Sequence, residues 1–426
     1  MNVSQRLDVP SCGCDDLAVS QGLTSVDQAF EIALELTQSV PNTQIVSLND
    51  ALGRVLAVPV LAGAMLPPFD NSGMDGYAVK LADLTGDGPW TLPVSDRIVA
   101  GETRTVSLPS NSAVRILTGA PVPIGADAVI MQEKVSAAKG EITVTQRPQM
   151  GENIRAAGED RAIGAQVLRA GHTFNTRSIA AAASAGAANV IVFCKLRVAI
   201  LITGDETVPT GTPLSTGAIW DINTPMLSAA LASNTVEITA IEHAKDTVDA
   251  LAEKFDRLSP CNDLIITTGG VSVGDEDHAH EAVYKAGGHI AVAGVAIKPG
   301  KPVTIGKIRR AVYLGLPGNP VSAFVTWTLF GLPILAKLSG ANKPASRHRY
   351  VTATKTITHK LGRREYRPAT ISSVENNGFE VVETLSKTHS ARLTPLTMAD
   401  GLVVIPADTD VIKQGDLIEF LPFCNT

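Results

Sequence analysis

Leu264–Asp277, which reads LIITTGGVSVGDED, is the stretch that decides the fold of this chain. Its apolar first half predicts a buried strand. Three glycines, a serine and three acidic residues follow. Glycines at a strand end let backbone N–H groups approach an anion, and a helix starting near Asp275 adds positive potential there. The acids oppose an anion unless a divalent cation lies between them. The stretch predicts either a phosphorylated ligand bound with a hard metal ion, or only a tight turn before a solvated acidic helix.

The regions on both sides of this stretch alternate between strand and helix patterns. Such alternation predicts a mostly parallel sheet with helices on both faces, and ligands bind at the carboxyl ends of its strands. The expected strands are 197–203, 237–241, 263–267, 289–297, 302–306 and 311–316, and the expected helices are 224–232, 246–258, 276–286 and 321–338.

The rest of the chain predicts further parts around this α/β domain, so the fold class is multidomain α/β plus β. Residues 1–23 are expected to be a flexible tail. A helix at 25–40, capped by Ser25, begins a helical and extended linking region. The expected parts are a linking region at 24–62 and 160–195, a β-rich inserted domain at 63–159, the α/β domain at 196–345, and a C-terminal β-barrel or sandwich at 346–426.

Composition excludes several classes of protein. The chain has 426 residues, a net charge of −6 and 4% aromatic residues, which argues against a nucleic-acid-binding surface. Its five cysteines, an odd number, fit a reducing cytoplasm. The polar first twenty residues lack a secretory signal. The Ala-rich stretch 179–202 is interrupted by Lys195 and Arg197, so it predicts a buried helix followed by a strand and not a membrane span.

Other loops carry chemically useful residues. Thr203–Glu206, Lys298–Pro302 and Leu316–Pro320 all adjoin expected strands of the α/β domain. Each alone fits an ordinary turn, but together they place glycines, lysines and carboxylates at one edge of one sheet. Pro67–Val79, Thr118–Pro123 and Gly151–Asp160 are loops outside this domain, with structural and functional interpretations equally open.

In their order and spacing, these motifs resemble the molybdopterin molybdenumtransferase family, which includes bacterial MoeA and the gephyrin E domain. The resemblance covers about residues 25 to 423. It rests on Phe69–Val79, Thr118–Pro123, Asn153–Asp160, Thr203–Glu206, Gly269–Gly274, Lys298–Pro302 and Pro317–Pro320.

The resemblance implies an elongated homodimer whose α/β domain is similar to the molybdopterin adenylyltransferase fold. It implies the insertion of molybdate into adenylylated molybdopterin, with cleavage of the pyrophosphate bond and release of AMP. It also implies Mg²⁺, a cytoplasmic location and a site shared between subunits, with the adenylyltransferase as a further candidate partner.

The resemblance also assigns roles to individual residues. It makes Asp75, Thr118, Asp160, Glu206, Asp277 and Lys298 catalytic, with the first three facing Glu206 and Lys298 across the dimer. It makes Glu206, Asp246 and Asp277 the metal ligands. The ligand-binding residues it implies are Gly269, Gly270, Ser272, Gly274, Lys301, Pro317, Asn319 and Pro320.

Some positions depart from the family pattern. Gly73 stands where alanine is common, Thr207 where leucine is common, and Gly294 where several relatives carry a lysine. The loss of that cation is expected to affect anion binding. Two alternatives remain, adenylyl transfer to molybdopterin and a catalytically weak binding scaffold. The lack of a fused adenylyltransferase domain in this sequence disfavours the scaffold.

Overall fold

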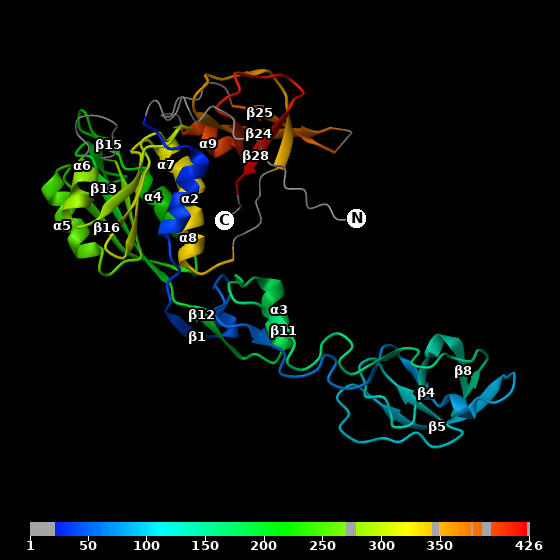
Figure 1. The fold of residues 1–426 in the computed structure, drawn as a ribbon. Coiled ribbons are helices and arrows are strands. Elements are labelled where there is room, and N and C mark those ends of the chain that lie inside the picture. The colour runs from blue at the N-terminus through cyan, green and yellow to red at the C-terminus, as the bar shows by residue number, and fades with distance from the viewer. Residues whose placement is uncertain (1–21, 270–277, 343–348, 376–377, 386–392, 424–426) are drawn as a thin grey trace.

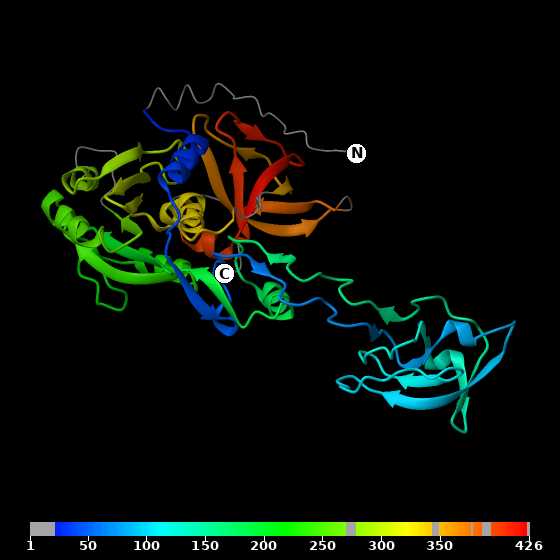
Figure 2. The ribbon, with the colours of Figure 1, turned by 60° about the horizontal axis from the view of Figure 1, so that its bottom comes forward.

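The computed structural model describes residues 22–269, 278–342, 349–375, 378–385 and 393–423. The chain is elongated (Figures 1 and 2). The α/β domain and the C-terminal domain lie side by side at one end, and the β-rich domain lies at the other. A small linking domain and extended segments of chain connect the two ends.

The α/β domain is built on a six-stranded sheet. Four strands run parallel and two antiparallel strands complete one edge, so the expected mostly parallel sheet is confirmed. In spatial order the strands are β16 (Val236–Ala244), β13 (Leu196–Thr203), β17 (Leu264–Thr268), β21 (Ala311–Leu316), β20 (Thr304–Ile308) and β18 (His289–Ala293).

The strands of this sheet are apolar on both faces because both faces are covered. Ile200, Ile266 and Leu314 pack into one core cluster, whereas the alternate positions Leu201 and Tyr313 pack into another. Side chains alternate along a strand, which divides each apolar run between the two cores. The helices of the domain are α4 (Asn223–Leu231), α5 (Val248–Leu258), α6 (His278–Lys285), α7 (Pro320–Thr326), a π-helical turn (Trp327–Gly331) and α8 (Leu332–Leu338).

The apolar helical stretch Pro320–Leu338 belongs to the first of these cores. It is long enough to cross a membrane and has a mean hydropathy of 1.6, but 61% of it is buried inside the protein. Ala323, Phe330 and Leu335 pack in the same cluster as the sheet. Helix α2 (Val26–Leu36) also packs there, and Ser25 caps it by accepting a hydrogen bond from the Gln28 N–H at 3.2 Å.

The linking domain combines segments that are distant in sequence. Strand β1 (Thr43–Ser47) pairs antiparallel with β12 (Asn189–Phe193), and β2 (Val60–Leu61) pairs with β11 (Gln166–Leu168). Leu48–Asp50 forms a 3₁₀ turn, and the Ala-rich segment forms helix α3 (Thr176–Ser184). The predicted order of helix and then buried strand at 179–202 is confirmed, because β12 and β13 follow α3.

The β-rich domain is a second six-stranded sheet. Two further short strands, β3 (Asn71–Ser72) and β10 (Ile154–Arg155), pair at its entrance, and 3₁₀ turns lie at Leu81–Asp83 and Gln132–Lys134. In spatial order the sheet contains β7 (Ala128–Met131), β4 (Gly76–Val79), β6 (Ala113–Ile116), β5 (Trp90–Ile98), β9 (Glu141–Val144) and β8 (Val135–Ala138).

The C-terminal domain is a closed barrel, which settles the choice between barrel and sandwich. Strand β24 pairs with both β25 and β26, and this double pairing closes the sheet. The barrel strands are β22 (Arg349–Ala353), β24 (Arg364–Val374), β25 (Glu380–Thr384), β26 (Gly401–Ile405) and β28 (Leu417–Pro422), accompanied by β23 (Ile357–Thr358), β27 (Val411–Ile412) and α9 (Thr394–Met398).

Several predicted boundaries differ from the structure. The helix expected at 25–40 ends at Leu36, and the strand expected at 289–297 ends at Ala293. Residues beyond Ala293 instead supply β19 (Ile297–Lys298), which joins the barrel by pairing in parallel with β24. Strands β14 (Thr207–Val208) and β15 (Ile219–Trp220) form a small flap after β13 that the sequence did not predict.

Candidate functional site

A cavity of about 730 Å³ opens at the carboxyl ends of β13, β17 and β21. This is the edge of the sheet at which the strand-end loops were predicted to meet. Its wall combines polar groups from these loops with apolar side chains from the β14–β15 flap. The lining residues are Ile202, Thr203, Glu206, Thr207, Leu214, Ile219, Trp220, Asp221, Ile222, Asn223, Thr268, Gly269, Gly318, Asn319, Pro320, Val321 and Leu393.

Gly269 lies where two strand-end loops are in contact. Its φ is +88°, and a Cβ there would lie 2.4 Å from the Thr203 carbonyl oxygen. A Cβ on Gly318 would in turn lie 3.4 Å from the Gly269 Cα. Only glycine fits at position 269, whereas the contact at Gly318 is an ordinary van der Waals distance. The predicted close approach of glycine backbone at the end of β17 is therefore confirmed for Gly269.

Gly270, Ser272, Gly274 and Asp277, which were predicted to bind phosphate or metal, lie outside the described residues. Their roles stay predictions.

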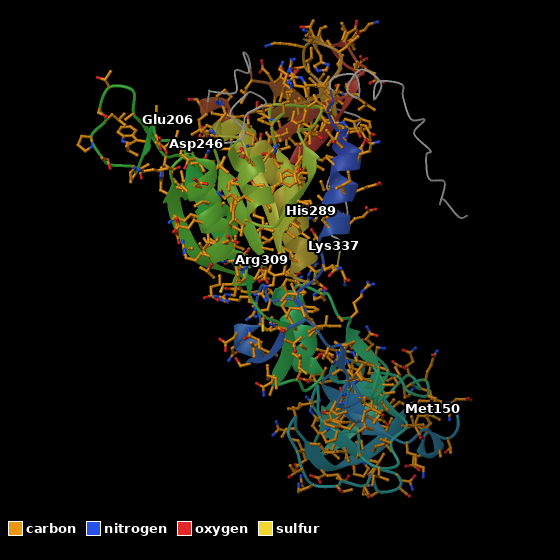
Figure 3. All side chains as sticks on the ribbon, turned by 60° about the vertical axis from the view of Figure 1, so that its left-hand side comes forward. Met150, Glu206, Asp246, His289, Arg309 and Lys337 are labelled. Carbon is orange, nitrogen blue, oxygen red and sulfur yellow. The ribbon has the colours of Figure 1, made fainter. Side chains whose placement is uncertain are left out.

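Glu206 and Asp246 lie near each other at the ends of neighbouring strands (Figure 3). The carboxylate of Glu206 lies over Gly204, at whose position a Cβ would meet Oε2 at 2.9 Å. Asp246 Oδ1 is buried and, among the described residues, has no hydrogen-bond partner. His278 Nδ1 lies 3.5 Å from it, too far for a well-formed hydrogen bond. Among the described residues, Glu206 and Asp246 do not belong to any group of three or more His, Cys, Asp or Glu side chains that could hold a metal ion.

Lys298 has a partner that the sequence did not indicate. Its Nζ lies 3.2 Å from Oε1 of Glu365, a barrel residue that is 1% exposed. Arg367 also binds Glu365, through Nε at 2.8 Å. Burial alone would raise the pKa of Glu365, but Arg367 and Lys298 outweigh it and leave that pKa lowered. Lys298 thus joins the α/β domain to the barrel, whether or not it also binds an anion.

The second predicted lysine, Lys301, is half-buried in the turn before β20, where its carbonyl accepts the Val295 N–H at 2.9 Å. Neither Lys298 nor Lys301 lines the cavity. Gly294, in the same turn, has a φ of +92°, and a Cβ there would lie 3.1 Å from Leu23. A lysine at this position would be strained, which accounts for glycine in this chain.

The turn after β21 is divided between cavity and core. Asn319 and Pro320 line the cavity, whereas Pro317 is buried behind it. Asn319 caps α7, with its Oδ1 accepting the Val321 N–H at 3.2 Å. The side-chain oxygen of Asn319 is therefore already hydrogen-bonded to the helix backbone.

Asp75 and Thr118 meet in the β-rich domain. Asp75 Oδ1 accepts hydrogen bonds from the N–H and the hydroxyl of Thr118, both at 2.7 Å. These two bonds, with a smaller contribution from Arg115, lower the pKa of Asp75. Asp160 is exposed, and its N–H donates to Leu66 in the strands that lead out of the domain. Figure 1 shows this domain far from the α/β domain of the same chain.

Sequence reasoning missed Asn223 and its neighbours. Asn223 begins α4 and bridges two strand ends, and Asp221 caps the same helix through the Thr224 N–H at 3.0 Å. The sequence feature that could have indicated them is the Asp-x-Asn pair at the start of a helix. Such pairs are common because Asp and Asn cap many helices, so the pair alone does not indicate a binding site.

Comparisons with known proteins agree between residues 24 and 423. The MoeA N-terminal region (domains I and II) matches residues 24–186, a probable molybdopterin binding domain matches 199–337, and the MoeA C-terminal region (domain IV) matches 350–423. A molybdopterin molybdenumtransferase of Haemophilus influenzae is 35% identical over 405 residues, covering 94% of this chain and 99% of that protein.

Two further relatives support the match. Molybdopterin molybdenumtransferase 2 of Mycobacterium tuberculosis is 36% identical over 382 residues, covering 88% of this chain and 93% of that protein. The crystal structure of the molybdopterin biosynthesis MoeA protein of Pyrococcus horikoshii superimposes with a TM-score of 0.82 at 27% identity, covering 94% of this chain and all of that chain.

The strand-end cavity, the C-terminal barrel and the distant β-rich domain define a multidomain protein, whose α/β domain matches the probable molybdopterin binding domain. The chain belongs to the molybdopterin molybdenumtransferase family.

Proposed function

We propose that this protein is a transferase of molybdenum cofactor biosynthesis, which inserts molybdate into adenylylated molybdopterin. The oxygen of a water molecule attacks the pyrophosphate bond of that substrate, AMP leaves, the other phosphate stays on the pterin, and the dithiolene retains the metal. Molybdate and adenylylated molybdopterin are the substrates. The proposal follows the agreement of relatives over nearly the whole chain.

The observation that carries the proposal is the cavity at the ends of β13, β17 and β21. Nucleotide and pterin ligands require close approach of bare backbone and a few placed polar groups. Gly269 and Gly318 supply the approach, and Glu206, Thr268 and Asn223 supply polar groups. A second carboxylate, Asp246, lies near Glu206 outside the cavity wall (Figure 3).

Mg²⁺ is part of this proposal. Glu206 and Asp246, with Asp277, would hold it. The ion would offset the negative charge of the phosphates, which otherwise faces these carboxylates. Glu206 would also orient the phosphate end of the substrate.

A homodimer with shared sites is also part of the proposal. Asp75 and Thr118 form a preorganised acceptor and donor pair. They belong to the β-rich domain, which Figure 1 shows far from the α/β domain that carries Glu206. Bringing the two groups to one substrate requires a second copy of the chain.

A cytoplasmic location and a partnership with the molybdopterin adenylyltransferase are proposed as well. Cys194 and Cys261, the cysteines that the structure describes, are free thiols, which suits a reducing compartment.

The test is AMP release from adenylylated molybdopterin, measured with and without molybdate. We expect release that requires both molybdate and Mg²⁺. Formation of adenylylated molybdopterin from ATP would instead indicate an adenylyltransferase. Tight binding without turnover would indicate a scaffold.

A further inference from the structure

His243 lies beside the turn that carries Glu206. It is the last residue but one of β16, and it pairs in register with Ile202 of β13, the strand that leads into this turn. Its ring Nε2 lies 3.2 Å from the Gly204 carbonyl oxygen and 3.3 Å from Thr207 Oγ1. The imidazole therefore joins the end of one strand to the turn that follows its neighbour.

The partners of His243 determine which of its ring nitrogens carries a proton. The Thr207 hydroxyl donates its single hydrogen to the Gly204 carbonyl oxygen at 2.8 Å, so toward His243 its oxygen only accepts. A backbone carbonyl also only accepts. Both contacts therefore require a hydrogen on Nε2, which donates to the two oxygens together.

The Gly204 peptide that His243 contacts is also the surface over which the Glu206 carboxylate lies. A Cβ at position 204 would lie 2.9 Å from Glu206 Oε2. Within the turn, the Thr207 N–H donates to the Gly204 carbonyl at 3.1 Å, and the Ile219 N–H of the flap donates to the Glu206 carbonyl at 2.9 Å. His243 adds a hydrogen bond to this turn from β16, an edge strand of the sheet.

We propose that His243 is a positioning residue, whose Nε2–H holds the turn after β13 so that the Glu206 carboxylate stays in the wall of the cavity. Glu206 and Thr207 line the cavity but His243 does not, so an effect of His243 on the substrate has to pass through the turn. A side chain on a fixed turn loses less conformational entropy when it engages a ligand. The role of Glu206 in turnover rests on the proposed function, whereas the contacts of His243 do not.

Kinetic coupling between His243 and Glu206 tests this role. His243→Ala should lower kcat/KM for AMP release at limiting Mg²⁺ about 10-fold, the effect of one hydrogen bond. His243→Gln should recover most of that loss, because its amide nitrogen can donate in place of Nε2. In a Glu206→Gln background, His243→Ala should cause almost no further loss, because both substitutions remove the same function. Equal losses in the two backgrounds would overturn the proposal.

His289→Ala is the matched control for the removal of an imidazole. His289 is also exposed, and it begins β18, the edge strand on the opposite side of the same sheet from β16. The control should keep the wild-type kcat/KM. A loss as large as that of His243→Ala would show that the effect is not specific to the turn and would overturn the proposal.

Hydrogen exchange tests the turn without relying on the reaction. His243 is exposed, so His243→Ala should leave the fold intact. The Thr207 and Ile219 amides should exchange about 10-fold faster, whereas the Leu251 amide of α5 should keep its rate. Unchanged exchange at Thr207 and Ile219 would overturn the proposal. Faster exchange in a protein whose wild type releases no AMP with molybdate would reject the proposed reaction but keep the role of His243 in holding the turn.

Discussion

Gly269 shows how one residue joins sequence, fold and site. It ends the apolar run of β17, and its left-handed backbone turns the chain beneath the Thr203 carbonyl. Any side chain there would separate the ends of β13 and β17 and reshape the cavity. The need for glycine was predictable from the sequence, but the identity of the opposing atom was not, because Thr203 is distant along the chain.

We expect Gly269→Ala to lower the free energy of unfolding by about 3 kcal/mol, from backbone strain and overpacking together. Gly211→Ala is the matched control, because Gly211 has a similar φ of +86° but nothing within 4 Å of its Cβ position. The control should lose only about 1 kcal/mol. Urea unfolding of the α/β domain measures both. Equal losses would show that the contact with Thr203 contributes nothing.

Glu206 places a carboxylate in the wall of the cavity, and we expect its charge to be needed for turnover. Glu206→Gln keeps the shape and removes the charge, so turnover should fall at limiting Mg²⁺ by about 100-fold while unfolding stays unchanged within about 0.5 kcal/mol. Glu253→Gln, on the exposed side of α5, is the control. Normal turnover of Glu206→Gln at limiting Mg²⁺ would assign Glu206 a structural role only.

At the scale of elements, strands and helices were predictable where apolar periodicity was strong. The α/β strands were found because burial on both faces leaves continuous apolar runs. Strand β19 was missed because it has only two residues and its partner, β24, lies in another domain. The flap was missed because its strands, β14 and β15, have only two residues each. The Asn223 bridge was missed because it joins α4 to segments that are distant in sequence.

Lys298, in β19, forms an ion pair with Glu365 of the barrel, and this pair should make the stability of the barrel depend on pH. The lowered pKa of Glu365 means that its contribution is fully present above its unfolded pKa, about 4.3, and is lost as the pH falls through the folded value. Glu365→Gln should therefore destabilise the barrel by about 3 kcal/mol at pH 7, since it leaves Arg367 without its buried carboxylate. It should also flatten the acid dependence below about pH 4.3.

Hydrogen exchange of the β24 amides reports on the barrel separately from the other domains. Glu383→Gln is the control, because Glu383 pairs with Lys355 at the surface. It should change stability by less than about 0.5 kcal/mol. Equal protection of the β24 amides in wild type and Glu365→Gln between pH 3 and 5 would show that the ionised carboxylate of Glu365 does not stabilise the barrel.

At the scale of the whole molecule, elongation has a functional consequence. The β-rich domain extends away from the α/β domain (Figure 2), so Asp75, which directly precedes β4, and Glu206, which follows β13, belong to domains at opposite ends of the chain. The domain order could be predicted from the sequence, because each part has its own pattern. The separation could not, because it depends on the path of the extended connecting segments.

This separation predicts complementation between two inactive variants. Asp75→Ala and Glu206→Ala should each abolish AMP release if both residues serve one site. In a mixed dimer, one site carries both substitutions and the other carries neither. Random mixing makes about half of the dimers mixed, so about a quarter of the wild-type activity should return. Mixing Glu206→Ala with Asp246→Ala is the control, because both residues come from the α/β domain and every site stays defective. Mass spectrometry verifies that mixed dimers have formed. If verified mixed dimers of the first pair remain as inactive as those of the control, the two residues do not share a site.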